Sequence, residues 1–480
     1  MTGRGSYNWV IVGALFLAEM TAAFETSMIY AALPKLNTEF GDAIMVGWLV
    51  TAYLLIGAAT AAATGRLGDI YGRRRVTLIV LAIATLGSLM SALAESFAPL
   101  LIGRGLQGVA AALLPLTFGL VRENLPPKQV PMGVGLMTSA ASAGAVTGLI
   151  MGGLMIDRLE WNSIFWASAF LSIISFVAVW LIVPKSPSVE VGTRPDWIGC
   201  ILFVPAISSI LLAISKGGEW GWGSPLVLGL FAAGAVISTI WVRRSLHATE
   251  PFIEIRLLAD PRVLLANLIV VFLALGALQI TLAFSVLMQT PTTSGFGLGL
   301  SATMAGIVKT PSSVFASVAG AVSGWLAARH GSSLVIMIGG LLLATGWAAA
   351  AVIPLTVPIL LALLCLISFG TGLVYASVPN VLLDAVPVDR TSEASGVMSV
   401  FRVAGLAIGA QIVVVLLATS TIANPTGGGS YPSPDAFRLT FAFVTAMSLC
   451  IAVLAIVLRR LNQRRTAAAS PSSTVVSPAE

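Results

Sequence analysis

Five ionisable side chains interrupt long apolar segments of the sequence: Glu19, Glu25, Arg104, Lys309 and Arg402. A charge among apolar groups is costly unless it is paired, hydrated or neutralised by a proton. A carboxylate in such a place can therefore take up a proton at one time and lose it at another, and a buried cation can hold an anionic group. These residue types indicate proton and ion binding rather than covalent chemistry.

Glu25 lies about four residues beyond the middle of the apolar run 9–33 and is the expected proton-coupling residue. A structural ion pair is the alternative role for its carboxylate. Glu19 lies nearer the middle of the run, about 240° around a helix from Glu25, so the two carboxylates are not expected to share a face. Glu19 is the second candidate for proton coupling.

Arg104 and Gln107 lie one turn apart in the run 97–121, at nearly the depth of Glu25. We expect them to form one polar cluster with Glu25, in which Arg104 holds the carboxylate ionised until substrate or a proton competes. A purely structural buried pair is the alternative role for Arg104.

Lys309 and Arg402 are charges of the second half of the sequence without an obvious carboxylate partner in that half. Lys309 is expected to meet Glu19, Glu25 or an anionic substrate group. Arg402 either ties helix ends together through Asp384 or Glu393, or lines a substrate cavity. The residues expected to line that cavity are Glu25, Gln107, Lys309 and Arg402.

The composition excludes a water-soluble fold, because 57% of the 480 residues are hydrophobic and only 10% are charged. The mean hydropathy is +0.96. Cys200, Cys365 and Cys450 lie inside apolar runs, and the two histidines, His247 and His330, are too few for a histidine-based metal centre. We therefore expect neither a disulfide framework nor a metal or cofactor site.

The apolar runs predict about fourteen membrane-spanning helices. The first run contains Glu19 and continues to Pro34, so it is expected to be a retained helix rather than a signal peptide. The runs lie at 9–33, 45–64, 76–94, 97–121, 131–156, 163–183, 197–215, 224–242, 262–288, 300–325, 332–353, 357–378, 394–419 and 436–460.

The positions of the basic residues predict that both termini are cytoplasmic. With the N-terminus inside, most of the 26 Lys and Arg residues fall in loops on that side. The opposite side receives only Lys35, Arg158, Lys216 and Arg438. The net charge of +6 is therefore a topology signal, and no nucleic-acid partner is expected.

Two glycine patterns recur at nearly the same offset, which predicts two six-helix repeats and an inserted pair of helices. Gly65-x-Leu67-x4-Gly72 recurs as Gly324-x-Leu326-x4-Gly331, and Gly135, Gly144 and Gly148 recur as Gly396, Gly405 and Gly409. The predicted domains are an N-terminal bundle at 1–183, a linker with the inserted helices at 184–261, a C-terminal bundle at 262–465 and a disordered cytoplasmic tail at 466–480.

Several motifs resemble those of the fourteen-helix drug:proton antiporter family of the major facilitator superfamily. The strongest is the loop GRLGDIYGRRR at 65–75, and the others are FETS at 24–27 with ALP at 32–34, WLVTAY at 48–53, and Arg104-x-x-Gln107-Gly108. The resemblance extends from about residue 9 to 460. The sequence departs from the family in having Glu25 where aspartate is usual, and GLIMGG at 148–153 where a proline follows the first glycine.

The resemblance implies an all-α membrane protein with the major-facilitator fold. It also implies that Gly65, Asp69, Gly72 and Arg73 form a conformational latch at the cytoplasmic edge, whereas a topology signal alone is the alternative role of the basic residues. Together with Ala140, the glycines of the fifth run form a ridge of small residues for which helix packing is a sufficient explanation. The ridge glycines are Gly144, Gly148 and Gly152, and Gly153 completes the glycine motif of this run.

The expected function is proton-coupled export of hydrophobic or amphipathic small molecules by alternating access. We expect a monomer in the cell (plasma) membrane whose partners are the substrate, protons and membrane lipids. Proton-coupled uptake of an organic anion is the alternative, because of Lys309, Arg402 and the missing proline. An enzyme is not expected, since no H-E-x-x-H motif or carboxylate pair occurs, and no G-x-x-x-x-G-K-[ST] loop points to ATP.

Overall fold

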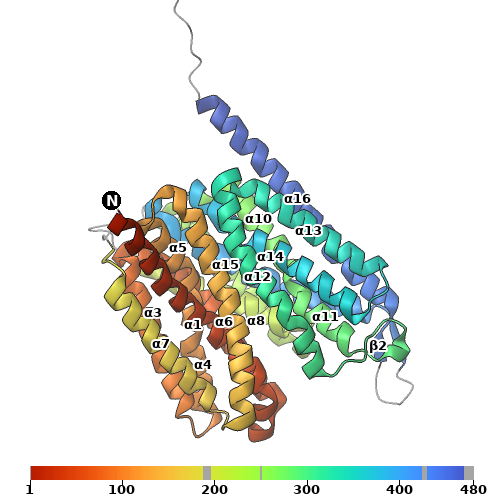
Figure 1. Cartoon of the computed structure of the whole chain (residues 1–480). Helices are drawn as coiled ribbons and strands as arrows, with labels where there is room; N and C mark the ends of the chain where they lie inside the picture. The colour runs from red at the N-terminus through yellow and green to blue at the C-terminus, as the bar shows by residue number, and fades with distance from the viewer. Residues whose placement is uncertain (1, 187–195, 249–250, 424–429, 470–480) are drawn as a thin grey trace, which may run out of the picture.

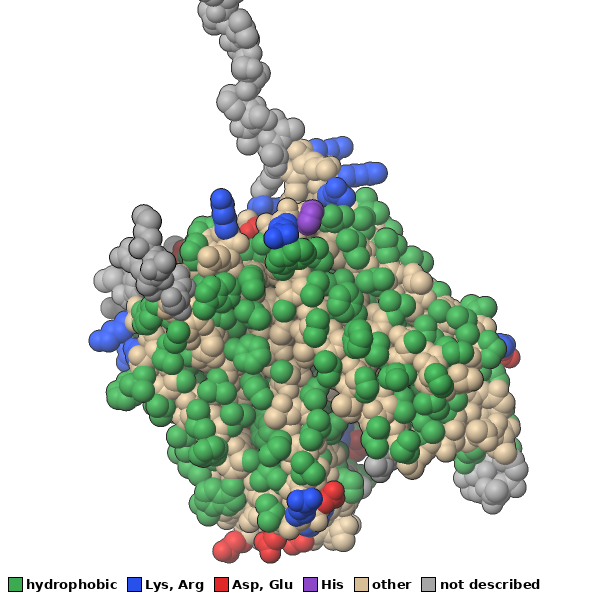
Figure 2. Space-filling model, viewed as in Figure 1, with side chains coloured by type: hydrophobic (Ala, Val, Ile, Leu, Met, Phe, Trp, Pro, Cys, Tyr) green, Lys and Arg blue, Asp and Glu red, His purple; other side chains and the backbone are tan. Residues whose placement is uncertain are grey.

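The computed structural model describes residues 2–186, 196–248, 251–423 and 430–469. Within these ranges, 14 helical segments are long and apolar enough to cross a membrane, which confirms the all-α membrane fold. The α1 helix begins and α16 ends at the same end of the molecule (Figure 1). Basic residues gather at that end, and acidic residues mark the opposite edge (Figure 2), as expected for cytoplasmic termini.

The first six spans form the N-terminal half. They are built from α1 (Thr2–Phe40), α2 (Ala43–Tyr71), α3 (Arg73–Ala92), α4 (Phe97–Gly108), η1 (Val109–Ala112), α5 (Leu113–Asn124), η2 (Pro127–Gln129), α6 (Val130–Arg158) and α7 (Ser163–Ile182). The inserted pair follows as α8 (Trp197–Trp220) and α9 (Pro225–His247).

The last six spans form the C-terminal half. Their elements are η3 (Ile255–Ala259), α10 (Pro261–Leu275), η4 (Ala277–Gln279), α11 (Ile280–Gln289), η5 (Thr292–Ser294), α12 (Ala302–His330), α13 (Ser332–Val352), α14 (Val357–Ala385), η6 (Val388–Arg390), α15 (Thr391–Ala418), β1 (Thr421–Ala423), β2 (Ser430–Pro432) and α16 (Pro434–Ala469). The strands form an antiparallel pair in which Ile422 faces Tyr431.

Two spans that the sequence predicts as continuous helices are broken. The span Phe97–Asn124 contains the 3₁₀ turn η1, which follows Gly108, where a Cβ atom would lie 2.6 Å from the carbonyl oxygen of Tyr53. The span Pro261–Gln289 breaks at Gly276, whose φ of −111° and ψ of −87° lie outside the helical region. Only the second break arises from the backbone angles of a glycine, because Gly108 keeps helical angles, with φ of −54° and ψ of −28°.

The domain boundaries after residues 183, 261 and 465 remain predictions. The tail predicted to be disordered from Thr466 begins inside α16, which continues to Ala469, and the rest of that tail lies outside the described residues. Part of the predicted linker, 187–195 and 249–250, also lies outside them.

The repeated glycines have equivalent roles in the two halves. Gly72 between α2 and α3 has φ of 94°, and Gly331 between α12 and α13 has φ of 83°, a conformation that only glycine adopts readily. A Cβ atom on Gly135 of α6 would lie 2.4 Å from the carbonyl oxygen of Gly320 on α12, and one on Gly396 of α15 would lie 2.6 Å from that of Ala61 on α2. The halves therefore meet through two equivalent close helix crossings.

The glycine ridge of α6 packs against α1. A Cβ atom added to Gly144 would lie 2.4 Å from the carbonyl oxygen of Met20. One added to Gly148 would lie 2.7 Å from the carbonyl oxygen of Phe24, and one added to Gly152 would lie 3.0 Å from that of Met28. A Cβ atom added to Gly153 would have no neighbouring atom within 4 Å. Close packing is thus the observed role of the first three glycines, and it fixes the helix that carries both membrane carboxylates.

Gly148→Ala should destabilise the protein by ~1–3 kcal/mol, because the added methyl group pushes against backbone atoms that cannot move aside. Gly153→Ala adds the same methyl group and the same gain in helix propensity where nothing is contacted, so it serves as the control. Thermal unfolding of both variants in the same detergent measures the difference. Equal melting temperatures would show that the ridge tolerates separation of the helices.

Candidate transport site

A cavity of about 470 Å³ lies between the two halves, within the size range of small-molecule sites. Its wall is mostly apolar and comes from α1, α2, η1, α5, α6, α8, α14 and α15. Hydroxyl groups of Thr26, Ser27, Thr51, Ser215 and Ser399 are scattered over it. Such a lining suits an apolar molecule that carries a few polar groups.

Glu19 and Arg402 bring opposite charges into this cavity from opposite halves. Only 4% of Glu19 is exposed, and its Oε2 atom has no hydrogen-bond partner. The positive charge of Arg402 acts on Glu19, and its guanidinium lies 5.9 Å from the ring centroid of Tyr375. Among the described residues neither charge has an ion-pair partner within 4.0 Å, so both remain available to a ligand, a proton or water.

Arg402 does not tie helix ends to Asp384 or Glu393, which was one of its two predicted roles. Glu393 is occupied instead by Arg390 at 3.2 Å and Arg66 at 3.7 Å. Arg402 lies about two and a half turns farther along α15 and faces the cavity.

Glu25 is completely buried in a separate polar cluster inside the N-terminal half. Its Oε1 atom accepts hydrogen bonds from Ser168 at 2.8 Å and Ser88 at 3.1 Å. The amide of Gln107 donates to the same two hydroxyls, at 2.7 Å to Ser88 and 3.3 Å to Ser168. Gln107 in turn accepts a 2.8 Å bond from Arg104. The predicted cluster of Glu25, Arg104 and Gln107 therefore forms.

Arg104 does not pair directly with the carboxylate of Glu25. It donates to the backbone carbonyl of Glu25 at 3.2 Å and to that of Leu49 at 3.3 Å, and its guanidinium lies 4.6 Å from the ring centroid of Tyr53. These contacts hold the guanidinium beside the backbone of α1. The two charges communicate through Gln107 and the serines.

Tyr53 separates the two polar sites, because its ring contacts Arg104 on one side and lines the cavity on the other. Its hydroxyl donates to the carbonyl of Ala22 at 3.0 Å. Glu25 and Gln107 therefore do not line the cavity, contrary to expectation, whereas Glu19 does. The predicted difference in face between Glu19 and Glu25 is confirmed.

Lys309 is also absent from the cavity wall. Its ammonium donates to the hydroxyl of Thr281 on α11, and no carboxylate of the described residues lies within ion-pair distance of it. Lys309 therefore does not meet Glu19 or Glu25 in this structure, and its contact with an anionic substrate group stays a prediction. Of the four residues expected to line the cavity, only Arg402 does so.

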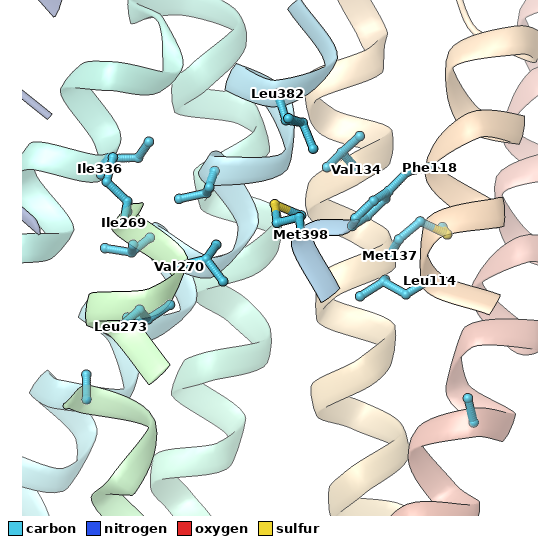
Figure 3. Close-up of a cluster of buried hydrophobic side chains, with 14 of the residues drawn as sticks. Leu114, Phe118, Val134, Met137, Ile269, Val270, Leu273, Ile336, Leu382 and Met398 are labelled. Carbon is cyan, nitrogen blue, oxygen red and sulfur yellow. The ribbon is translucent and has the colours of Figure 1, made fainter. Parts of the chain in front are cut away.

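An apolar cluster closes the cavity on its cytoplasmic side. Met398 of α15 lies beside Phe118 and Leu114 of α5, where the side chains of the two halves meet (Figure 3). The space left among these residues is about 10 Å³, about that of a single water. At the opposite end, the surface is hollowed between the halves (Figure 2). The arrangement is outward-facing.

Asp69, one of the residues predicted to form the latch, joins the two halves at the cytoplasmic end by capping a helix of the other half. Its carboxylate accepts hydrogen bonds from the backbone N–H groups of Glu393 at 2.8 Å and Ser392 at 3.3 Å. These groups belong to the first turn of α15, whose own N-cap residue makes no side-chain cap bond. A carboxylate at this position satisfies free N–H groups and complements the helix dipole.

Arg73 completes the latch. It pairs with Asp69 at 2.8 Å and donates to the hydroxyl of Ser392 at 3.0 Å and to the carbonyl of Gly119 at 3.3 Å. Gly65 permits the close approach of the helices, since a Cβ atom there would lie 2.3 Å from the carbonyl oxygen of Ser392. Gly72 provides the turn that brings Arg73 back toward Asp69.

Further charges join this latch that the sequence did not single out. Arg66 is 2% exposed and pairs with Glu393, which also accepts a 2.6 Å bond from the N–H of Glu254. Arg122 donates to the hydroxyl of Thr391 at 2.8 Å. From the sequence, Arg66 and Arg122 are expected only as topology signals. A basic residue at the end of a predicted helix looks the same in sequence whether it sets the topology or contacts the other half.

A multi-pass bundle with a cavity between two halves and a latch at one end defines a membrane transporter. The sequence pattern of the Major Facilitator Superfamily matches residues 15–410 and 299–479. The chain therefore belongs to the major facilitator superfamily, and it is a transporter rather than an enzyme.

Several relatives of the chain are efflux proteins. The cephamycin export protein CmcT of Amycolatopsis lactamdurans is 30% identical over 470 residues, which cover 94% of each chain. The multidrug resistance protein Stp of Mycobacterium tuberculosis is 29% identical over 400 residues, covering 82% of this chain and 72% of Stp. An uncharacterized MFS-type transporter of the same species is 28% identical over 414 residues, and the match spans only 58% of that relative's length.

Solved structures confirm the fold. The human organic anion transporter MFSD10 (TETRAN) superposes with a TM-score of 0.65 at 16% identity, covering 93% of this chain and 99% of the other. The proton:xylose symporter XylE superposes with a TM-score of 0.64 at 15% identity, covering 93% and 95%.

Asp69→Asn should weaken the latch, because the variant keeps an acceptor oxygen but loses the charge that complements Arg73 and the α15 N-terminus. We expect hydrogen exchange of the backbone amides of Ser392 and Glu393 to accelerate by about tenfold, corresponding to ~1.4 kcal/mol. Asp196→Asn, at the N-cap of α8, is the control. Unchanged exchange at α15 in Asp69→Asn would exclude Asp69 as the closing group.

Proposed function

We propose that this transporter exports hydrophobic or amphipathic small molecules across the plasma membrane in exchange for protons. The observation that carries the proposal is the cavity itself, in which a buried carboxyl, Glu19, faces the cation Arg402 across a mostly apolar space. The efflux pumps among its relatives support the direction of transport. We further propose that the protein acts as a monomer, with the substrate, protons and membrane lipids as its partners.

The exchange follows from the charge balance of the cavity. With Glu19 ionised, the charges of Glu19 and Arg402 cancel, and an uncharged apolar molecule is tolerated. A proton that reaches Glu19 from the outside leaves Arg402 unbalanced in an apolar space, which attracts water or an anion and lowers the affinity for a neutral molecule. Proton uptake on the outside thus favours release of a neutral or cationic substrate there.

Glu25 is proposed as the second proton-coupling group, although it lies outside the cavity. Protonation would change its hydrogen bonds with Ser88 and Ser168, and thereby the network that Gln107 and Arg104 continue. This network joins α1, α3, α4 and α7, and Arg104 extends it to α2. A change of charge at Glu25 is therefore transmitted to the packing of the N-terminal half.

Proton-coupled uptake of an organic anion is the second candidate function, because Arg402 lines the cavity. An anion would bind Arg402 most strongly when Glu19 is protonated, so proton and substrate would travel together. The sign of the pH dependence separates the two functions: an antiported neutral substrate binds more weakly as the pH falls, and a symported anion binds more strongly.

Glu19→Gln should abolish pH-driven accumulation of the neutral dye N-phenyl-1-naphthylamine in everted vesicles, while dye binding persists and becomes less dependent on pH. Glu25→Gln should also abolish pH-driven accumulation, and Glu25→Asp should have a mild effect because it keeps a titratable carboxyl. Accumulation is followed by dye fluorescence after the vesicle lumen is acidified. Wild-type accumulation in Glu19→Gln would remove this residue from the mechanism.

The membrane potential should matter for a neutral substrate and not for a monovalent cation. Exchange of one proton for a neutral molecule moves one charge, for which 100 mV supplies about 2.3 kcal/mol, or roughly a 50-fold gradient. Exchange for a monocation moves no net charge, so only the pH difference drives it. Dissipating the potential at a constant pH gradient should lower accumulation of N-phenyl-1-naphthylamine and leave that of tetraphenylphosphonium nearly unchanged. Transport that survives collapse of both gradients and stops on ATP depletion would contradict proton coupling.

A further inference from the structure

The inserted helix α8 contacts both halves of the transporter, since it packs on α2 and on α15. Three of its residues, Leu211, Leu212 and Ser215, line the central cavity. Leu211 is 3% exposed, whereas Ser215 is exposed near the outer end of the helix. Thus α8 is part of the cavity wall and not only a spacer between the two repeats.

The place of α8 follows from how α2 and α15 diverge. The two helices touch near the cytoplasmic end, where Gly65 meets Ser392 and Gly396 meets Ala61. Farther out, Leu54 of α2 and Ala410 of α15 both border the cavity. The cavity residues of α8 complete the wall on this side, where an opening would otherwise face the bilayer.

The outer end of α8 is attached to α2 through Trp48. The ammonium of Lys216, which is 7% exposed, lies 5.2 Å from the ring centroid of Trp48 and pairs with Glu219 at 2.7 Å. Trp220 lies 6.1 Å from Trp48, centroid to centroid. Trp48 belongs to the WLVTAY motif, and its observed role is to anchor α8.

Contacts with α15 hold α8 from the other side. A Cβ atom on Gly218 would lie 3.0 Å from the amide oxygen of Gln411. Nearer the cytoplasmic end, Phe203 packs in a cluster that includes Ala62 of α2 and Val397 and Val400 of α15. The helix is therefore fixed along its length between one helix of each half.

The opposite side of the cavity has a different construction. There α6 and α12 meet near the cytoplasmic end, where Ser139 donates to the carbonyl of Ser317 at 2.7 Å and Gly135 lies against Gly320. Among the described residues, α12 contributes nothing to the cavity wall. The inserted pair thus covers one of the two junctions between the halves.

We propose that α8 is a substrate-contacting wall of the cavity, which closes the α2–α15 side against lipid and selects the transported molecule. Leu211 and Leu212 receive the apolar body of an amphipathic substrate, and Ser215 receives a polar group near the outer mouth. The assignment of the cavity to transport rests on the proposed function. The position of α8 in the cavity wall rests only on the geometry of the structure.

Cysteine labelling tests the geometry without any substrate. In full-length protein whose Cys200, Cys365 and Cys450 are replaced by alanine, Ser215→Cys should react with a membrane-impermeant maleimide added outside intact cells. A thiol reacts as its thiolate, which forms in water and not in lipid. Ala232→Cys on α9, exposed and outside the cavity wall, should not react. Equal labelling at both positions, or none at Ser215→Cys in folded protein, would overturn the proposal.

A bulky substitution tests selection. Leu212→Trp should weaken binding of N-phenyl-1-naphthylamine by about tenfold, because the ring occupies space that the dye needs. Leu228→Trp on α9, 54% exposed and away from the cavity, should leave binding unchanged and is the matched control. Equal affinities of the two variants would contradict substrate contact by α8.

The two proposals fail in different ways. Labelling of Ser215→Cys together with a dye affinity that Leu212→Trp lowers would support the wall even if pH-driven transport were absent. Proton-driven transport in the wild type with no effect of Leu212→Trp would keep the proposed function and reject the wall. If the wild type does not bind the dye, absence of labelling at Ser215→Cys in folded protein would still reject α8 as a wall of the cavity.

Discussion

At the closed cytoplasmic end the two halves are joined by a hydrogen-bonded contact, in which the carboxylate of Asp69 on α2 caps the N-terminus of α15 in the other half. The first N–H groups of a helix have no partner within that helix and carry partial positive charge, so a carboxylate satisfies both demands. Arg73 balances the charge of Asp69 and carries the contact on to Gly119 and Ser392. Because a side chain at Gly65 would collide with Ser392, the glycine is a condition of the latch. The predicted latch is thus a helix cap supplied by a different half of the molecule.

Two helices, α5 and α15, each carry residues of the latch, of the apolar closure and of the cavity wall in order along their length. On α15, Ser392 belongs to the latch, Met398 to the apolar cluster and Arg402 to the cavity. On α5, Leu114 borders the cavity, Phe118 lies in the cluster, and Gly119 reaches the latch. The contact between the halves, the apolar closure and the cavity wall therefore follow one another along the same two helices, α5 and α15.

The sequence predicts the helices well because the bilayer allows only long apolar segments to cross it, and it predicts their halves because Gly72 and Gly331 need the same positive φ. It also separates the faces of Glu19 and Glu25, which depends only on helical periodicity. It does not predict which residue of a distant helix a side chain meets. The sequence therefore allows an ion pair between Arg402 and Glu393 as one alternative, although in the structure Glu393 pairs with Arg66. Lys309 was paired with α1, although its ammonium contacts Thr281. The cavity role of α8 could not be inferred, because Leu211 and Leu212 look like any lipid-facing residues.

The two membrane carboxyls lie on one helix, α1. Glu19 and Glu25 lie on different faces of it, one toward the cavity and one toward the network of Ser88, Ser168, Gln107 and Arg104. Tyr53 stands between these environments, because its ring lines the cavity beside Arg104 and its hydroxyl bonds to the backbone of α1. The glycine ridge of α6 holds α1 so closely that a methyl group added at Gly144 or Gly148 would collide with the α1 backbone. Both carboxyls therefore belong to one helix, whose position is set by its close contact with α6.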